Sequence, residues 1–216
     1  MYSDLTGIIL AGGKSSRMGA NKSFLKLGNK TIIERTADLM KSVFENVIII
    51  TNTPTDYDSL ELPTYEDIYK LNEPIAGIHC GLVNSKTEKN YFISCDMPLM
   101  TKETIDFILN YKTTKPITVA RADGFVQQLC GVYSKKVLPE IIKLINEKKS
   151  GYDNKNKNRI CKVLQLVKRL DAEIIPIETE FKGYEEGMFF NMNRPEEFEY
   201  IKERLALDGF LKSYRL

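Results

Sequence analysis

The chain has 216 residues, and its 31 basic and 29 acidic side chains leave a formal net charge of +2. That length can bury a substantial core in one domain, residues 1–216, and the near-neutral charge argues against nucleic acid or a membrane surface as a partner. Cys80, Cys95, Cys130 and Cys161 form no CxxC pair, so we expect buried thiols in a reducing compartment, not a zinc site or disulfides. We expect no signal peptide and no membrane span, and therefore a cytoplasmic protein.

Short β-rich runs alternate with helical patterns along the chain. Several of these runs are almost wholly apolar, which is typical of strands covered on both faces. The predicted strands are residues 6–10, 47–51, 91–95, 117–121, 129–134 and 173–177. The predicted helices are residues 31–42, 75–85, 102–111, 135–148, 159–170 and 195–205. Thr101 is the expected N-cap of the third helix, and Pro195 suits the first turn of the last. The alternation predicts an α/β domain with a mostly parallel sheet.

The first predicted strand runs into LAGGKSSRMGANK, residues 10–22, which combines paired glycines with three cations. Ligands of open α/β sheets bind at the carboxyl ends of the strands, and glycines let backbone N–H groups approach an anion closely. Arg17 and Lys22 add charge-assisted donors for phosphate oxygens. The string lacks both the GxGxxG and the GxxxxGK[ST] spacing. We predict a polyphosphate-binding loop, the alternative being a glycine-rich turn with ordinary surface cations.

Further polar residues follow other predicted strands. Asp96, in FISCDMPLM, lies just past an apolar run, at the same edge of the predicted sheet as the glycines. A carboxylate beside a triphosphate is well placed to hold Mg²⁺, which prefers oxygen ligands; a simple turn before Pro98 is the alternative. On the residues alone, Asn52 is a good turn residue and Asp67 a loop acid. For His79, the single histidine, we expect a core or helix-surface role and no part in catalysis.

The string LAGGKSSRMGANK resembles the signature LAGGxSxRMGxxK of the nucleotidyltransferases that act on the molybdenum cofactor, and most closely that of the guanylyltransferases. The resemblance implies a three-layer α/β/α fold with a Rossmann-like sheet, of the nucleotide-diphospho-sugar transferase type. It implies Mg²⁺ as cofactor, with GTP and molybdopterin as substrates. The terminal phosphate of molybdopterin would attack the α-phosphate of GTP and release pyrophosphate. A molybdopterin-donor protein and acceptor molybdoenzymes would be further partners.

The resemblance also implies roles for individual residues. The implied nucleotide-binding residues are Leu10, Ala11, Gly12, Gly13, Lys22, Asn52, Asp67 and Asp96. Arg17 and Lys22 would be catalytic, because they would stabilise the charge on the leaving pyrophosphate. Asp96 resembles the metal-binding Asp of the family's CDMP element. The stretch FFNMNRPEEF is similar to the closing FxNxNTPEE, which implies that Asn191 and Asn193 contact molybdopterin.

Some positions depart from the family pattern or bear on specificity. Glu73, Gln128 and Arg194 stand where Gly, Pro and Thr are usual, and we expect these departures to bear on acceptor specificity. Related cytidylyltransferases resemble LAAG, with alanine at the position of Gly12, so the pair Gly12-Gly13 implies room for guanine. The alternatives are a cytidylyltransferase, a relative with another phosphate acceptor, and a non-catalytic nucleotide sensor or cofactor carrier.

Overall fold

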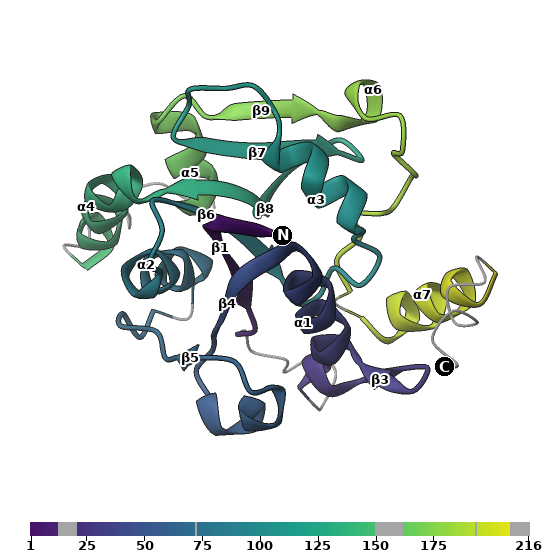
Figure 1. Cartoon of the computed structure of the whole chain (residues 1–216). Coiled ribbons are helices and arrows are strands. Elements are labelled where there is room, and N and C mark those ends of the chain that lie inside the picture. Colours follow the sequence, from purple (N-terminus) through teal and green to yellow (C-terminus); the bar gives the residue numbers. More distant parts are fainter. Residues whose placement is uncertain (13–20, 72, 150–161, 193, 208–216) are drawn as a thin grey trace.

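The structure is a computed structural model that describes residues 1–12, 21–71, 73–149, 162–192 and 194–207, and these residues include a seven-stranded sheet of order β5-β4-β1-β6-β8-β7-β9 (Figure 1). Its strands are β1 Tyr2–Leu10, β4 Phe44–Ile50, β5 Thr64–Tyr65, β6 Lys89–Ser94, β7 Ile117–Ala122, β8 Phe125–Ser134 and β9 Glu173–Pro176. In this described sheet β8 runs antiparallel to both neighbours, and the other pairings are parallel. A separate hairpin joins β2, Lys26–Leu27, to β3, Lys30–Thr31.

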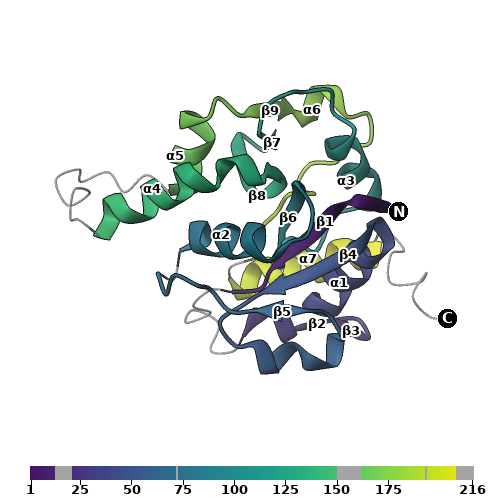
Figure 2. The same ribbon diagram turned by 60° about the vertical axis from the view of Figure 1, so that its left-hand side comes forward.

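Helices cover both faces of the sheet. They are α1 Ile32–Val43, α2 Pro74–Asn84, α3 Lys102–Leu109, α4 Leu138–Lys149, α5 Lys162–Arg169, α6 Ile177–Glu180 and α7 Pro195–Leu207, with 3₁₀ turns η1 Lys22–Phe24, η2 Pro54–Leu60 and η3 Lys135–Val137. Successive strand residues point to opposite faces: Ile9 packs in the cluster that includes α1 and α3, whereas Ile8 packs in the cluster that includes α2, α4 and α5. The described elements therefore form the predicted α/β/α layers, which Figure 2 shows from a second side.

The predicted strands and helices are confirmed within a few residues at each end, except that residues 159–161, where one predicted helix begins, lie outside the described residues. Thr101 caps α3 by accepting a hydrogen bond from the N–H of Thr104, and α7 begins at Pro195. The sequence reading missed β5, α6, η1, η2 and the β2–β3 hairpin, which are too short to show a period. The sequence reading also did not predict that β8 runs antiparallel to its neighbours. Asp123 and Gly124 have φ angles of 53° and 78°, the conformation of a two-residue hairpin turn, so β7 and β8 must be antiparallel.

The parallel register brings three strand ends together. Leu10 at the end of β1 pairs with Ile50 of β4 on one side and with Ser94 of β6 on the other. The alignment continues past the strands, since the N–H of Ala11 donates to the carbonyl of Ile50 at 2.9 Å and the N–H of Cys95 donates to that of Leu10 at 3.1 Å. Residues that follow β1, β4 and β6 therefore share one edge of the sheet.

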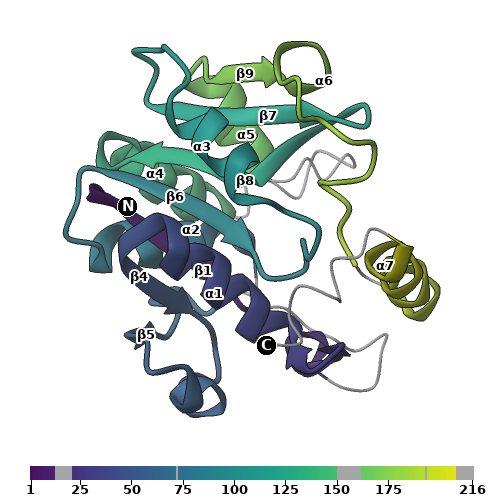
Figure 3. The same ribbon diagram turned by 45° about the vertical axis from the view of Figure 1, so that its right-hand side comes forward.

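The helix α7 lies beside the sheet and does not form part of either helix layer. Figure 3 shows α7 apart from the helices that cover the sheet. Ile201 and Leu205 of α7 pack with Leu27 of the β2–β3 hairpin and with Ile32 at the start of α1. Met192, in the segment that leads into α7, is buried in the same cluster. Through this contact the C-terminal part of the chain is held close to the edge at which β1 and β6 end.

The remaining expectations on composition have the following outcomes. Among the described cysteines, Cys80, Cys95 and Cys130 are buried free thiols; Cys161 lies outside the described residues. His79 is buried with its ring edge-on to Tyr69 at 4.8 Å, and burial lowers its pKa, in agreement with a core role. In the part of the chain that is described, no helix has the length and apolarity needed to cross a bilayer.

Candidate functional site

The first half of the site lies where β1, β4 and β5 end. The side chain of Asn52 lies close enough to the carboxyl group of Asp67 to lower the pKa of that group, and a methyl group on Gly12 would lie 3.9 Å from Asn52 Nδ2. Gly77 of α2 lets the helix approach closely, because a Cβ there would lie 3.1 Å from Leu10 Cδ2 and 3.7 Å from Asp67 Oδ1. Gly12, Asn52 and Asp67, which the resemblance assigned to the nucleotide, are thus neighbours.

In this half of the site, Asp67 is a buried carboxyl group whose pKa is shifted. Its side chain is buried, and burial raises the pKa of its carboxyl group, while the positive charge of Lys70 and the nearby amide of Asn52 act in the opposite direction. Among the described residues, no group hydrogen-bonds Asp67 Oδ1. A buried acceptor without a partner costs free energy. A ligand that donates an N–H or O–H at this point would remove that cost.

The backbone groups of Leu10 and Ala11 anchor the end of β1 next to Gly12. Both side chains are buried, and the backbone carbonyl of Leu10 accepts from the N–H of Cys95. The carbonyl of Ala11 accepts from the buried hydroxyl of Tyr57 at 2.9 Å. Their main-chain groups therefore fix the position of Gly12, and direct contact of Leu10 and Ala11 with a nucleotide stays a prediction.

Lys22 and Asp96 meet at the centre of the strand edge, although 74 residues separate them. Lys22 Nζ lies 2.5 Å from Asp96 Oδ2 and donates to the carbonyl of Met192 at 3.2 Å. Asp96 Oδ1 accepts from the hydroxyl of Ser94 at 2.5 Å, and its backbone carbonyl accepts from the N–H of Met192 at 2.9 Å. Both charged side chains are mostly buried, so their positions are well defined and their charges weakly screened.

The adjoining Cys95 is a structural thiol. Burial raises the pKa of Cys95 to about 11, and the nearby Asp96 acts in the same direction. The thiol is therefore neutral at physiological pH and is a poor nucleophile. It forms a buried hydrogen bond of 3.2 Å with Ser23 Oγ, which ties the turn that carries Lys22 to the end of β6.

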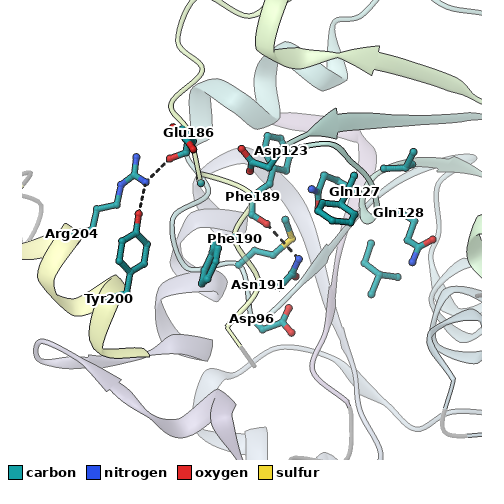
Figure 4. Close-up of a pocket in the computed structure, with 15 residues that line it drawn as sticks. Asp96, Asp123, Gln127, Gln128, Glu186, Phe189, Phe190, Asn191, Tyr200 and Arg204 are labelled. Carbon is teal, nitrogen blue, oxygen red and sulfur yellow. Dashed lines mark hydrogen bonds between the residues drawn. The ribbon is translucent and has the colours of Figure 1, made fainter. Parts of the chain in front are cut away.

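A cavity of about 1120 Å³ opens on the other side of Asp96 (Figure 4). Its walls come from β8, the β7–β8 turn, the segment before α7, and α7 itself. They include Asp96, Asp123, Phe125, Gln127, Gln128, Glu186, Phe189, Phe190, Asn191, Tyr200 and Arg204. Figure 4 shows the side chains of Asp96 and Asn191 near one another in this cavity. Aromatic walls with a few polar groups are typical of small-molecule sites.

The three residues that depart from the family pattern, Glu73, Gln128 and Arg194, do not all lie in the same part of the site. Gln128 lines the cavity. Glu73 instead immediately precedes α2, the helix that approaches Asp67, so it lies on the side of Gly12 and Asn52. Arg194 is exposed, and its backbone N–H donates to Glu197 at 2.8 Å. Of the three, Gln128 is therefore the residue whose position suits acceptor recognition.

Three predicted site residues, Gly13, Arg17 and Asn193, lie outside the described residues. The structure also adds residues that sequence reasoning missed. Tyr57 lies in a segment without a motif, and the cavity residues Phe125 and Arg204 are 79 residues apart in the chain, so no local spacing could join them. The Asp-Gly turn before Phe125 was the one usable signal, because it predicts the hairpin that builds the cavity wall.

Asp96 is the described residue best placed to hold a metal. No group of three or more His, Cys, Asp or Glu side chains that could hold a metal ion occurs among the described residues. A carboxylate offers about four lone-pair sites, and in Asp96 Ser94 and Lys22 each use one. Mg²⁺ is commonly bound by one or two carboxylates plus substrate phosphates and water. The donor set therefore fits Mg²⁺ bound together with a phosphate ligand, and does not fit a metal held by the protein alone.

Comparison with known proteins agrees with this geometry. The family model described as the MobA-like NTP transferase domain matches residues 7–176. The chain belongs to this family. A probable molybdenum cofactor guanylyltransferase of Clostridium perfringens (strain 13 / Type A) is 33% identical over 193 residues, which cover 88% of this chain and 92% of that protein. A protein of the same description from Aquifex aeolicus (strain VF5) is 34% identical over 205 residues, covering 94% and 92%.

A solved structure extends the comparison to the MobA-like fold. The Archaeoglobus fulgidus protein described as molybdopterin-guanine dinucleotide biosynthesis protein A superposes with a TM-score of 0.76, covering 93% of this chain and 98% of that one. The two are 22% identical, so this likeness concerns the fold. The MobA-like chain thus has the mostly parallel, helix-flanked sheet of the nucleotidyltransferases, and the family resemblance inferred from the glycine string is confirmed.

Proposed function

We propose that this chain transfers GMP from GTP to the terminal phosphate of molybdopterin, with Mg²⁺, and forms the guanine dinucleotide cofactor and pyrophosphate. The observation that carries the proposal is the Lys22–Asp96 pair, which lies between two unlike sites. On one side are Gly12, Asn52 and Asp67; on the other is the large cavity. A group-transfer enzyme needs two such sites that meet at charged groups. The names of the relatives support GTP and molybdopterin as their occupants.

The reaction requires the attacking phosphate to be aligned with the α-phosphate of GTP and the negative charge of the phosphates to be neutralised. The attacking phosphate is already an anion, so the step needs no strong general base, and buried His79 has no role in it. Lys22 would give up part of its hydrogen bonding to the Asp96 carboxylate and the Met192 carbonyl. It would then donate hydrogen bonds to oxygens of the α-phosphate and the departing pyrophosphate. Its stabilisation of charge there is the main contribution of the described residues.

Asp96 would hold Mg²⁺ through its carboxylate oxygens, together with the phosphates of GTP. The bound ion would supply positive charge and Lewis acidity to the phosphate oxygens. The hydroxyl of Ser94 keeps the carboxylate of Asp96 oriented toward the strand edge. The same carboxylate would keep Lys22 close to the phosphates by its own negative charge.

Asp67 and Asn52 would bind the nucleoside part of GTP. The buried Asp67 Oδ1, which no described group hydrogen-bonds, would accept from an N–H or O–H of the nucleoside. Asn52 lies near both the Asp67 carboxyl group and Gly12. On the other side, a cavity of about 1120 Å³ has room for a pterin-sized acceptor, with Asn191 beside Asp96.

Pyrophosphate release is the direct test. With GTP, Mg²⁺ and molybdopterin together, we expect release that stops when any one of the three is left out. CTP in place of GTP is the matched control for base choice. Faster release with CTP would make the protein a cytidylyltransferase. Binding of GTP without any release would contradict the proposed reaction and favour a nucleotide sensor or carrier, or a relative with another phosphate acceptor.

A further inference from the structure

Tyr57 joins two segments of the site through its hydroxyl group. The side chain comes from η2, between β4 and β5, and has no solvent exposure. Its hydroxyl donates to the carbonyl of Ala11 at 2.9 Å and accepts from Nδ2 of Asn21 at 3.3 Å. A carbonyl can only accept and an amide NH₂ can only donate, so the phenol serves in both of its roles. The result is one directed chain, Asn21 to Tyr57 to Ala11.

Both ends of this chain are next to proposed nucleotide groups. Ala11 precedes Gly12, and Asn21 precedes Lys22. Asn21 is the N-cap of η1, because its Oδ1 accepts from the N–H of Ser23 at 3.1 Å. The orientation of that amide therefore sets the direction of the turn that presents Lys22. The Tyr57 hydroxyl fixes this orientation because it accepts a hydrogen bond from Nδ2, the other polar atom of the same amide.

Two further contacts show that η1 is held as a unit. The ring of Phe24 packs on the ring of Tyr57 at 5.2 Å, and Ser23 Oγ is hydrogen-bonded to Cys95 Sγ, beside Asp96. Tyr57 thus holds the turn toward the end of β1, while Cys95 holds it toward the end of β6. Lys22 lies between these two anchors.

A buried tyrosine hydroxyl needs partners for stability alone, and the chain offers an internal comparison. Tyr91 is equally buried, and its hydroxyl bonds Cys130 Sγ at 3.0 Å. That bond joins β6 to β8 and involves no residue next to Gly12 or Lys22. The partners of Tyr57 are instead Ala11, which precedes Gly12, and Asn21, which precedes Lys22.

We propose that Tyr57 is a positioning residue for nucleotide transfer: its hydroxyl holds Lys22, through Asn21 and η1, in register with Gly12. The part that concerns GTP rests on the proposed function. The part that concerns η1 does not, because it is a statement about the protein alone. The two parts therefore have separate measurements.

The first experiment uses Tyr57→Phe, which keeps the ring and its contact with Phe24, and Tyr91→Phe as the matched control. GTP binding is titrated calorimetrically with Mg²⁺ present, and hydrogen exchange is followed at the Ser23 amide without nucleotide. Each variant loses one buried hydroxyl group, which makes two hydrogen bonds in Tyr57 and one in Tyr91, so we expect both to lose thermal stability and Tyr57→Phe to lose more. We expect only Tyr57→Phe to speed exchange at Ser23 and to weaken GTP binding, by about 3- to 10-fold.

The second experiment asks whether Tyr57 acts through Lys22. In a Lys22→Ala background, Tyr57→Phe should change GTP affinity by less than about 2-fold, since coupled residues are not additive. An undiminished effect in that background would overturn the positioning role. So would exchange at Ser23 that Tyr57→Phe leaves unchanged. If the wild type binds no GTP but Tyr57→Phe still speeds exchange at Ser23, the proposed function fails and the link to η1 stands.

Discussion

Replacing Gly12 by alanine tests base selection without disturbing the protein. A Cβ at this position would meet Asn52 Nδ2 at 3.9 Å and Thr51 Cα at 4.0 Å, which are ordinary contacts, and the φ angle of Gly12 is not in the left-handed region. We therefore expect unchanged stability or a gain of about 0.4–1 kcal/mol from the stiffer unfolded chain. The added methyl group would face the nucleotide and crowd a purine more than a pyrimidine.

The magnitude follows from the size of the group. One methyl group in a close-fitting pocket changes discrimination by about 1–3 kcal/mol, or roughly 5- to 150-fold. We expect the ratio of kcat/KM for GTP to that for CTP to fall by such a factor in Gly12→Ala, with GTP preferred by the wild type. The assay is pyrophosphate release with both nucleotides at limiting concentrations.

The control is Gly81→Ala, where a Cβ would lie 2.7 Å from Phe92 Cε1 and 3.0 Å from Ile8 Cγ2. Overpacking there should cost about 1–3 kcal/mol of stability and leave the GTP-to-CTP ratio unchanged. A wild type that prefers CTP would refute the assignment to guanine. An unchanged ratio in Gly12→Ala would show that Gly12 does not select the base.

Three more substitutions test the charged groups. Asp96→Asn should fold and lose most turnover, because a neutral amide is a poor Mg²⁺ ligand; near-normal turnover at limiting Mg²⁺ would contradict this. Lys22→Ala should weaken GTP binding and lower kcat by about 10- to 100-fold, the worth of one charge-assisted bond of about 1.5–3 kcal/mol; intact affinity and turnover would show that Lys22 does not contact the phosphates. Asp67→Asn should weaken GTP binding yet raise the free energy of unfolding at pH 7 by about 0.5–2 kcal/mol. Because the pKa of Asp67 is raised in the folded state, wild-type stability falls as the pH rises from the unfolded pKa through the folded one. Urea titrations should therefore show that the gain in stability of Asp67→Asn vanishes in acid. A gain that persists in acid would show that the raised pKa of Asp67 is not its cause.

The local parts of the site could be predicted because each has its own signal at a strand end. The glycine pair follows the apolar run of β1, and Asp96 follows that of β6. The parallel order of strands then places both at one edge. The Lys22–Asp96 contact was not predictable in detail, since it joins residues 74 apart and depends on how η1 turns. Tyr57 carries no motif at all, and only the packing of η2 brings its hydroxyl to Ala11.

The two halves of the site differ in how their polar groups are satisfied by the protein. Asp96 and Lys22 satisfy each other, with help from Ser94 and Met192, so they need no ligand in order to fold correctly. Asn52 lies near the Asp67 carboxyl group and lowers its pKa, yet the Oδ1 of Asp67 has no hydrogen-bond partner among the described residues. Folding therefore leaves an unfavourable free energy at Asp67, which a bound group that donates a hydrogen bond would remove. This difference favours a site in which Asp67 selects the nucleotide by binding, while Lys22 and Asp96 exchange partners during the transfer.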